Sequence, residues 1–185
     1  MRKIISLAGL AAAVTMAGTT VTSLPAASAA TGAASPRAAC NLNWGTNAKH
    51  RGTDATVRTP VKAVRAGQHG CFDRLVIDMG TGPKPSFDAR YVRHIIAQGS
   101  GRVLRVRGHA RILINVRGPA GRHFPANAVN LVNVAGFTTF RQVRGAGSFE
   151  RITSIGLGVR AKLPFRVFEL GSSADGWRIV IDVAH

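Results

Sequence analysis

Short runs of β-branched and other apolar residues, separated by glycine, proline or polar residues, recur along most of the chain. One run, Arg-Leu-Val-Ile-Asp-Met at 74–79, returns about a hundred residues later as Arg-Ile-Val-Ile-Asp-Val at 178–183. Both copies are too short for an apolar helix and follow turn-like residues, so both are predicted to be strands of a packed sheet. Because the pattern occurs near both ends of one region, it suggests two related halves that close on one core from opposite sheets.

The remaining apolar runs extend this pattern over the chain, and beyond the first thirty residues no helix longer than two turns is predicted. Segment 57–66 is expected at a sheet edge, because Pro60 cannot donate to a ladder and Lys62 and Arg65 discourage further pairing. The spacing predicts an all-β fold, a sandwich of two antiparallel sheets with pseudo-repeated halves. The predicted segments are 57–66, 71–79, 87–96, 103–107, 111–117, 131–134, 137–143, 148–159, 165–170 and 177–183.

Residues 103–107 and 111–117 carry the clearest alternation and are predicted to pair as a hairpin. In the second strand Ile112, Ile114 and Val116 are expected to face the core, which leaves a guanidinium-rich face outside. The following stretch, 118–130, has no periodicity and is expected to be either mobile or functional.

The first residues have the features of a secretory signal peptide spanning 1–29. Arg2 and Lys3 form a positive start, an apolar stretch follows, and Ala27-Ser28-Ala29 fits a small-residue cleavage site after Pro25. A retained membrane anchor is the alternative, but the stretch is too short and too rich in small polar residues. The protein is therefore predicted to be exported, with a flexible leader at 30–56 and one domain at 57–185.

The large positive net charge of the chain favours an anionic partner. The chain has 20 arginines and 5 lysines against 8 acidic residues, a net charge of +17 that becomes +15 when cleavage removes Arg2 and Lys3. Such a charge attracts polyanions. Outside the cell these are wall polymers, anionic lipid head groups or polysaccharides, and nucleic acid is not expected. The alternative is compositional, since an arginine-rich chain with abundant alanine, glycine and valine is what a GC-rich genome tends to encode.

The chain has two cysteines, Cys40 and Cys71. An even number of cysteines in an oxidising compartment predicts a disulfide between them. Closing a loop of this size would remove roughly 3.5–4 kcal/mol of unfolded-state entropy in the chain-entropy model. A catalytic Cys71 activated by His69 is the alternative, and it is disfavoured. The disulfide would hold the leader, including Trp44, against the first repeated strand.

An ordered set of motifs resembles the AMIN-like domain of secreted proteins and lipoproteins in actinobacteria, over almost the whole chain after Cys40. The resemblance implies a β-sandwich of two similar halves and a role in targeting to the cell envelope near peptidoglycan. In the family, Gly-Ser-Phe-Glu is usually followed by glycine, whereas Arg151 stands here and would be strained at positive φ. The motifs are His69–Asp78, Gly147–Glu150, Gly156–Arg160, Leu163–Phe168 and Arg178–His185.

The candidate ligand-binding residues are the arginines of the predicted hairpin and its neighbour, because guanidinium groups bind carboxylates and phosphates bidentately. A solvated charged face without a ligand is the alternative. Tyr91, Trp44 and Trp177 could stack on sugar rings, although Trp177 is expected in the core. Structural ion pairs or turn caps are expected for Asp73, Arg74, Asp78, Arg178 and Asp182. The candidate arginines are Arg90, Arg93, Arg105, Arg107, Arg111 and Arg117.

No catalytic constellation is predicted. The six histidines show no HExxH or other paired metal spacing, and the few carboxylates suggest no glycosidase pair. The chain is therefore expected to be a monomeric, non-catalytic module without metal or cofactor, secreted and associated with the cell wall. It would bind peptidoglycan or a teichoic-type polyanion, with possible peripheral contact to the membrane surface. The alternative is a secreted accessory or inhibitor protein that docks on another exported protein.

Overall fold

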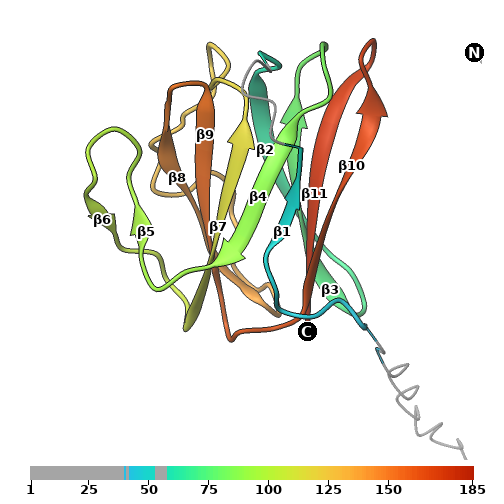
Figure 1. The fold of residues 1–185 in the computed structure, drawn as a ribbon. Helices are drawn as coiled ribbons and strands as arrows, with labels where there is room; N and C mark the ends of the chain where they lie inside the picture. The colour runs from blue at the N-terminus through green and yellow to red at the C-terminus, as the bar shows by residue number, and fades with distance from the viewer. Residues whose placement is uncertain (1–39, 41, 53–57) are drawn as a thin grey trace, which may run out of the picture. The chain divides into compact units, whose positions relative to one another are not determined.

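A computed structural model describes residues 40, 42–52 and 58–185, so the predicted signal peptide and most of the leader lie outside the described residues (Figure 1). This part of the chain contains eleven strands, and none of it forms a helix long and apolar enough to cross a membrane. The strands are β1 (Lys49–Arg51), β2 (Val61–Gln68), β3 (Phe72–Met79), β4 (Ser86–Tyr91), β5 (Ile95–Ile96), β6 (Val103–Leu104), β7 (Ala110–Arg117), β8 (Phe140–Phe149), β9 (Ile152–Val159), β10 (Phe165–Ser172) and β11 (Gly176–Ala184).

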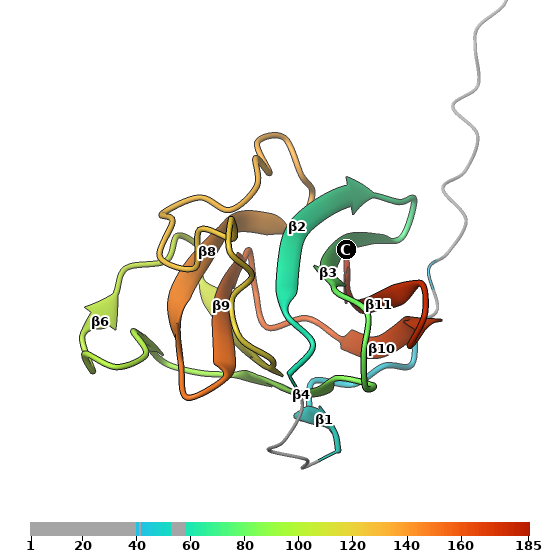
Figure 2. The ribbon, with the colours of Figure 1, turned by 90° about the horizontal axis from the view of Figure 1, so that it is seen from above.

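The strands form two facing sheets, with a small third sheet outside them. One sheet has the order β1-β4-β7-β9-β8 and the other β10-β11-β3-β2, while β5 and β6 pair only with each other. Every strand pair is antiparallel. Seen from above, the two main sheets face each other and β6 lies beyond β8 and β9 (Figure 2). The predicted all-β antiparallel sandwich is confirmed.

A single hydrophobic core fills the space between the main sheets. Alternate residues of β7, namely Ile112, Ile114 and Val116, are fully buried, as the sequence pattern predicted. They belong to the same buried cluster as Ile77 of β3 and Ile181 of β11. This period-two burial is typical of strands that pack one face on a core.

The repeated segments lie beside each other in one sheet, so their predicted placement in opposite sheets is wrong. Strands β3 and β11 pair with Arg74 opposite Asp182, Val76 opposite Val180 and Asp78 opposite Arg178. Antiparallel pairing of two copies of an Arg-x-Val-Ile-Asp pattern brings the arginine of each copy opposite the aspartate of the other. Opposite charges across a strand pair are favourable, and Arg74 forms such an ion pair with Asp182, whereas Asp78 pairs with Arg65 of β2.

The predicted hairpin of 103–107 with 111–117 is also wrong. Strand β6 pairs with β5, and β7 pairs with β4 and β9. Gly108 has φ +126°, and a side chain there would collide with the backbone of Val159, so the chain turns across β9 at this point. The predicted 87–96 strand is also divided, since β4 joins the main sheet and β5 leaves it to pair with β6.

The predicted strand 148–159 consists of two strands joined by a tight turn. Strand β8 ends at Phe149, β9 begins at Ile152, and the two residues between them have positive φ, 47° for Glu150 and 61° for Arg151. A two-residue loop of this kind is a type I′ turn, which favours Asn-Gly or Gly-Gly because side chains are strained there. The strain expected at Arg151 is therefore confirmed.

The 118–134 segment, whose first part was expected to be mobile or functional, is ordered and bridges the two sheets. Pro119 accepts a hydrogen bond from the amide of Val61 at 2.9 Å, which attaches the segment to edge strand β2. Ala128 accepts one from Gly145 at 2.9 Å, which attaches it to edge strand β8. Figure 2 shows this connection running between β2 and β8. The segment therefore covers the edge of β8 between Val143 and Gly147 and that of β2 at Val61.

Part of the leader packs against the other side of the sandwich. Strand β1 pairs with β4, Phe165 donates a backbone hydrogen bond to Gly45 at 3.0 Å, and the predicted disulfide joins Cys40 to Cys71. Arg51 lies 2.9 Å from Glu169 of β10. Backbone and ionic contacts therefore hold residues 42–52 of the predicted leader beyond the disulfide.

Replacing Arg151 with glycine should stabilise the domain. A side chain at this φ is strained by about 1–2 kcal/mol, and glycine relieves that strain at a smaller entropic cost, so we expect a gain of about 1 kcal/mol. Thermal unfolding should show a midpoint about 3 °C higher. Arg178→Gly, at an ordinary extended position in β11, should instead lower it. An unchanged or lower midpoint for Arg151→Gly would contradict the strained-turn interpretation.

Tyr91 is the single tyrosine of the chain, so its titration can be followed alone. Burial raises the pKa of its hydroxyl above the ordinary 10.0, although a backbone hydrogen bond from Leu163 opposes the rise. As the pH rises, the unfolded chain loses this proton before the folded protein does. The contribution of the protonated hydroxyl to the free energy of unfolding is therefore complete below pH 10, and it is lost as the pH rises through the pKa of the folded state. Tyrosinate absorbance should therefore titrate at higher pH in the native than in the urea-unfolded protein. Equal midpoints would refute this.

Candidate functional site

The small β5–β6 sheet is fixed on the outer face of the five-stranded sheet. Ile95 of β5 forms a buried cluster with Val106 and Ala146, and Leu113 of β7 packs against it. Glycines on β9 make this close approach possible, since a side chain at Gly156 would crowd Ile95 and one at Gly158 would collide with the backbone of Arg107. The β5–β6 sheet is therefore a second layer whose position is set by packing.

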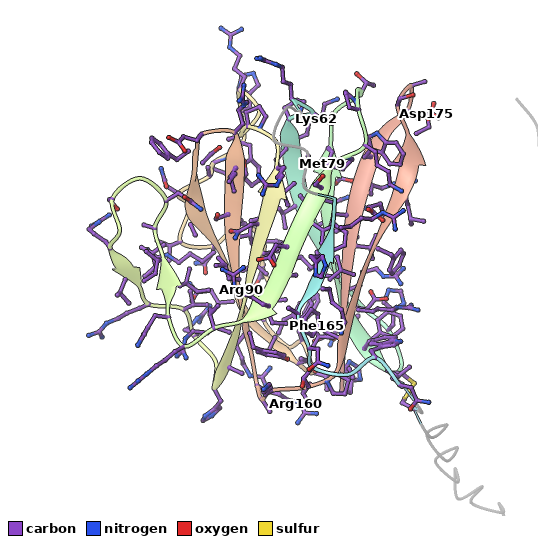
Figure 3. The ribbon with its side chains drawn as sticks, viewed as in Figure 1. Lys62, Met79, Arg90, Arg160, Phe165 and Asp175 are labelled. Atoms are coloured by element: carbon purple, nitrogen blue, oxygen red, sulfur yellow. A yellow bond between two sulfur atoms is a disulfide. The ribbon has the colours of Figure 1, made fainter. Side chains whose placement is uncertain are left out.

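The edge of this layer forms a hollow of about 490 Å³, which we call the arginine hollow. Four of the six predicted arginines line it, together with one histidine and apolar residues, and no carboxylate is among its lining residues. In Figure 3, side chains with nitrogen at their tips radiate from β5 and β6 away from the main sheet. The lining residues are Arg93, His94, Val103, Leu104, Arg105, Val106, Arg107 and Arg111.

Backbone contacts hold the arginine hollow in place while leaving its side chains available. The amide of Arg107 donates to Oε1 of Gln142 at 2.8 Å, and Arg144 donates to the carbonyl of Arg105 at 3.0 Å. Arg111 uses its own guanidinium to bind the carbonyls of Val106 and Gly108, each at 3.2 Å. Arg111 is thus a structural member of the hollow.

The other arginines of the hollow are available to a ligand. Arg93, Arg105 and Arg107 are exposed, and their guanidinium groups make no hydrogen bond or ion pair with any described residue. Sequence reasoning did not identify Gln142 or Arg144, which position the backbone from β8. No sequence signal could have found them, because their role depends on the crossing of 105–108 over β9.

Arg90 and Arg117, the remaining predicted arginines, lie in a different hollow on the same sheet face. This sheet hollow, of about 360 Å³, is lined by strands β1, β4, β7 and β9. Arg90 forms an ion pair with Asp88 on its own strand, whereas Arg117 has no ionic partner among the described residues. The six arginines therefore do not converge on one point. The lining residues are His50, Gly52, Phe87, Asp88, Arg90, Asn115, Arg117 and Ile152.

The outer face of the four-stranded sheet carries a different cluster, centred on Asp182. This carboxylate is fully buried, and it accepts two hydrogen bonds from Arg74 at 2.7 and 2.9 Å and one from Arg166 at 2.9 Å. The hydrogen bonds to Asp182 raise the pKa of Arg74 above its usual value, against the effect of burial. Because Arg74, Asp182 and Arg166 are in register on β3, β11 and β10, one aspartate joins three strands.

Aromatic rings surround these arginines. The guanidinium carbon of Arg166 lies 4.4 Å from the ring centroid of Trp44, and that of Arg74 lies 5.2 Å from the centroid of Phe72. Both contacts are within the range of cation–π attraction. Trp44 was a candidate for stacking on a sugar, but Arg166 lies over its ring.

The remaining sequence candidates have structural positions. Trp177 packs against the core, as predicted, and donates to the carbonyl of Gly82 at 3.0 Å. Asp73 accepts hydrogen bonds from the amides of Thr139 and Phe140, and Asp78 forms an ion pair with Arg65. The expectation of ion pairs or caps is thus confirmed for these two aspartates and for Asp182 with Arg74. Over the described ranges, no three metal-ligating side chains gather in one place.

Removing the carboxylate of Asp182 should destabilise the fold far more than removing that of Asp78. Asp182→Ala leaves two arginines without their shared buried partner, with an expected loss of about 2–3 kcal/mol. Asp78 occupies the same position in the other repeat, but its side chain is 24% exposed and its partner Arg65 59% exposed. Asp78→Ala should therefore cost less than about 1 kcal/mol. Urea unfolding of both variants tests this, and equal losses would contradict a central role for Asp182.

Comparison with known proteins agrees with the architecture. The family model of the AMIN-like domain matches residues 59–185, which spans the sandwich from just before β2 to the end of the chain. No curated protein and no solved structure matches the chain. Since the matched region includes all but one strand of the described fold, the chain belongs to the AMIN-like domain family.

Proposed function

We propose that this protein is a non-catalytic, exported module that binds an anionic polymer of the cell wall through the arginine hollow. The observation that carries the proposal is a set of three exposed guanidinium groups around one hollow that have no ionic partner among the described residues, those of Arg93, Arg105 and Arg107. Guanidinium groups bind phosphate and carboxylate oxygens in pairs, which suits teichoic phosphates and the peptide stems of peptidoglycan.

The internal use of carboxylates adds to this argument. Asp78, Asp88, Asp182 and Glu169 each face an arginine within the domain. The few acidic residues therefore neutralise arginines elsewhere and leave those of the hollow uncompensated. Attraction of a polyanion to such a surface is electrostatic and should weaken as salt screens it.

The family and the disulfide support an extracellular setting. Disulfides persist in oxidising compartments, and the Cys40–Cys71 bond joins the leader to the residue just before β3. An AMIN-like domain suggests a binding module related to peptidoglycan. Export through the predicted signal peptide would bring the arginine hollow to wall polymers, which are the abundant anions there.

Co-sedimentation with purified cell wall tests the proposal. The wild-type protein should pellet with wall at low salt and be released at about 0.5 M salt. A triple variant, Arg93→Gln with Arg105→Gln and Arg107→Gln, should bind cell wall at least about tenfold more weakly than the wild type, because three exposed ionic contacts are lost. Anionic vesicles in parallel measure any affinity for a membrane surface.

A matched variant separates the hollow from net charge. Arg58, Arg122 and Arg178 are exposed and lie outside the arginine hollow. Changing these three to glutamine removes the same charge and should weaken binding only slightly. Equal effects of the two triple variants would mean that binding depends on charge alone. Failure to pellet with wall, together with a stable complex with an exported protein, would favour the accessory-protein alternative, and muropeptide turnover would overturn the non-catalytic proposal.

A further inference from the structure

A third hollow, which we call the turn hollow, lies at the strained β8–β9 turn. It has a volume of about 550 Å³ and is lined by Arg117, Glu150, Arg151 and Ile152. Neither Arg117 nor Arg151 forms an ion pair with another described residue. Two guanidinium groups, one from β7 and one from the β8–β9 turn, therefore border one open space, with a single carboxylate beside them.

Arg151 occupies this hollow at an energetic disadvantage. Its φ of +61° is a conformation that glycine adopts without strain and other residues adopt at a cost. Strained residues that persist are concentrated at sites where the side chain has a function. The guanidinium of Arg151 is what glycine could not supply, and it adds positive charge next to Arg117.

The three hollows follow strand β7 in order. Arg111 near the start of β7 lines the arginine hollow, Asn115 lines the sheet hollow, and Arg117 at the end of β7 lines both the sheet hollow and the turn hollow. These residues share one face of the strand, because they are separated by even numbers of positions. Arg111 and Arg117 are six residues apart, which is about 20 Å along a strand.

The sheet hollow supplies further hydrogen-bond donors between Arg111 and Arg117 of β7. Ser154 donates to Oδ1 of Asn115 at 2.7 Å, so the amide nitrogen of Asn115, a hydrogen-bond donor, remains for the sheet hollow. His50 and Arg90 border the same hollow, and so does Asp88, the carboxylate that pairs with Arg90. A ligand that runs along this face would therefore meet donors at its two ends and at Asn115, with Asp88 and the apolar Leu113 between them.

We propose that the turn hollow is a second anion subsite and that one extended polyanion occupies both it and the arginine hollow. The inference rests on the proposed function and narrows its ligand to a polymer with repeated anionic groups that spans about 20 Å. Arg117 and Arg151 bind its distant groups. Two weak subsites joined by one ligand give an affinity well above that of either subsite.

Titration calorimetry with poly(glycerol phosphate) at low salt tests this inference. A chain just long enough to span 20 Å should bind one per protein, about a hundredfold more tightly than an oligomer too short to span the hollows. Arg151→Gly should weaken binding of the long chain about three- to fivefold while raising the melting temperature, so lost folding cannot explain the effect. Its affinity for the short oligomer should change less.

Removing the negative charge of Glu150, the neighbour of Arg151, should change the affinity in the opposite direction. Glu150→Gln keeps the shape of the side chain and removes the repulsion of an anion, so binding of the long chain should become tighter by a similar factor. Arg178→Gln, on the other sheet, is the neutral control.

The outcomes separate the two proposals. Weak binding of both phosphate ligands by wild-type protein that still pellets with cell wall would overturn the second subsite, whereas failure to pellet as well would overturn the proposed function itself. Equal affinity for long and short chains, or no effect of Arg151→Gly and Glu150→Gln, would overturn only the second subsite and leave the arginine hollow as the binding site.

Discussion

The pairing of β3 with β11 is the interaction on which the rest of the sandwich depends. It joins two segments a hundred residues apart in the sequence and supplies the central strands of the four-stranded sheet. On the inner face, Ile77 and Ile181 enter the common core. On the outer face, Asp182 is buried between Arg74 and Arg166 and links three strands. Hydrophobic burial and charge pairing thus select the same register, since a slip by one residue would reverse both faces.

The outer faces of the two main sheets use arginine differently. On the four-stranded sheet, Arg74 and Arg166 share the buried Asp182 and lie over aromatic rings. On the five-stranded sheet, Arg90 pairs with Asp88, but the β5–β6 layer carries exposed arginines that have no carboxylate partner among the described residues. This difference indicates where on the surface an anion would bind, which the net charge of the chain does not.

Local patterns in the sequence predicted local structure well. Alternation fixed the inward residues of β7, the even cysteine count predicted the Cys40–Cys71 disulfide, and a departure from a family glycine anticipated positive φ at Arg151. The sequence did not predict which strands pair, because periodicity indicates which face of a sheet a residue occupies but not which strand lies beside it. Residues 103–107 alternate like a strand of the main sheet, yet Val106 is buried in the outer layer. The candidate arginines were accordingly identified by residue, but their division between hollows depended on tertiary packing.

The bridge formed by residues 118–134 has a consequence for recognition. Because its backbone is hydrogen-bonded to β8 between Val143 and Gly147 and to Val61 at the start of β2, an incoming peptide cannot add a strand to β8 there. Recognition at these margins is left to side chains, whose identity can change without altering the scaffold. Such an arrangement allows the module to acquire new ligand preferences through surface substitutions alone, while its hydrogen-bonded frame stays the same.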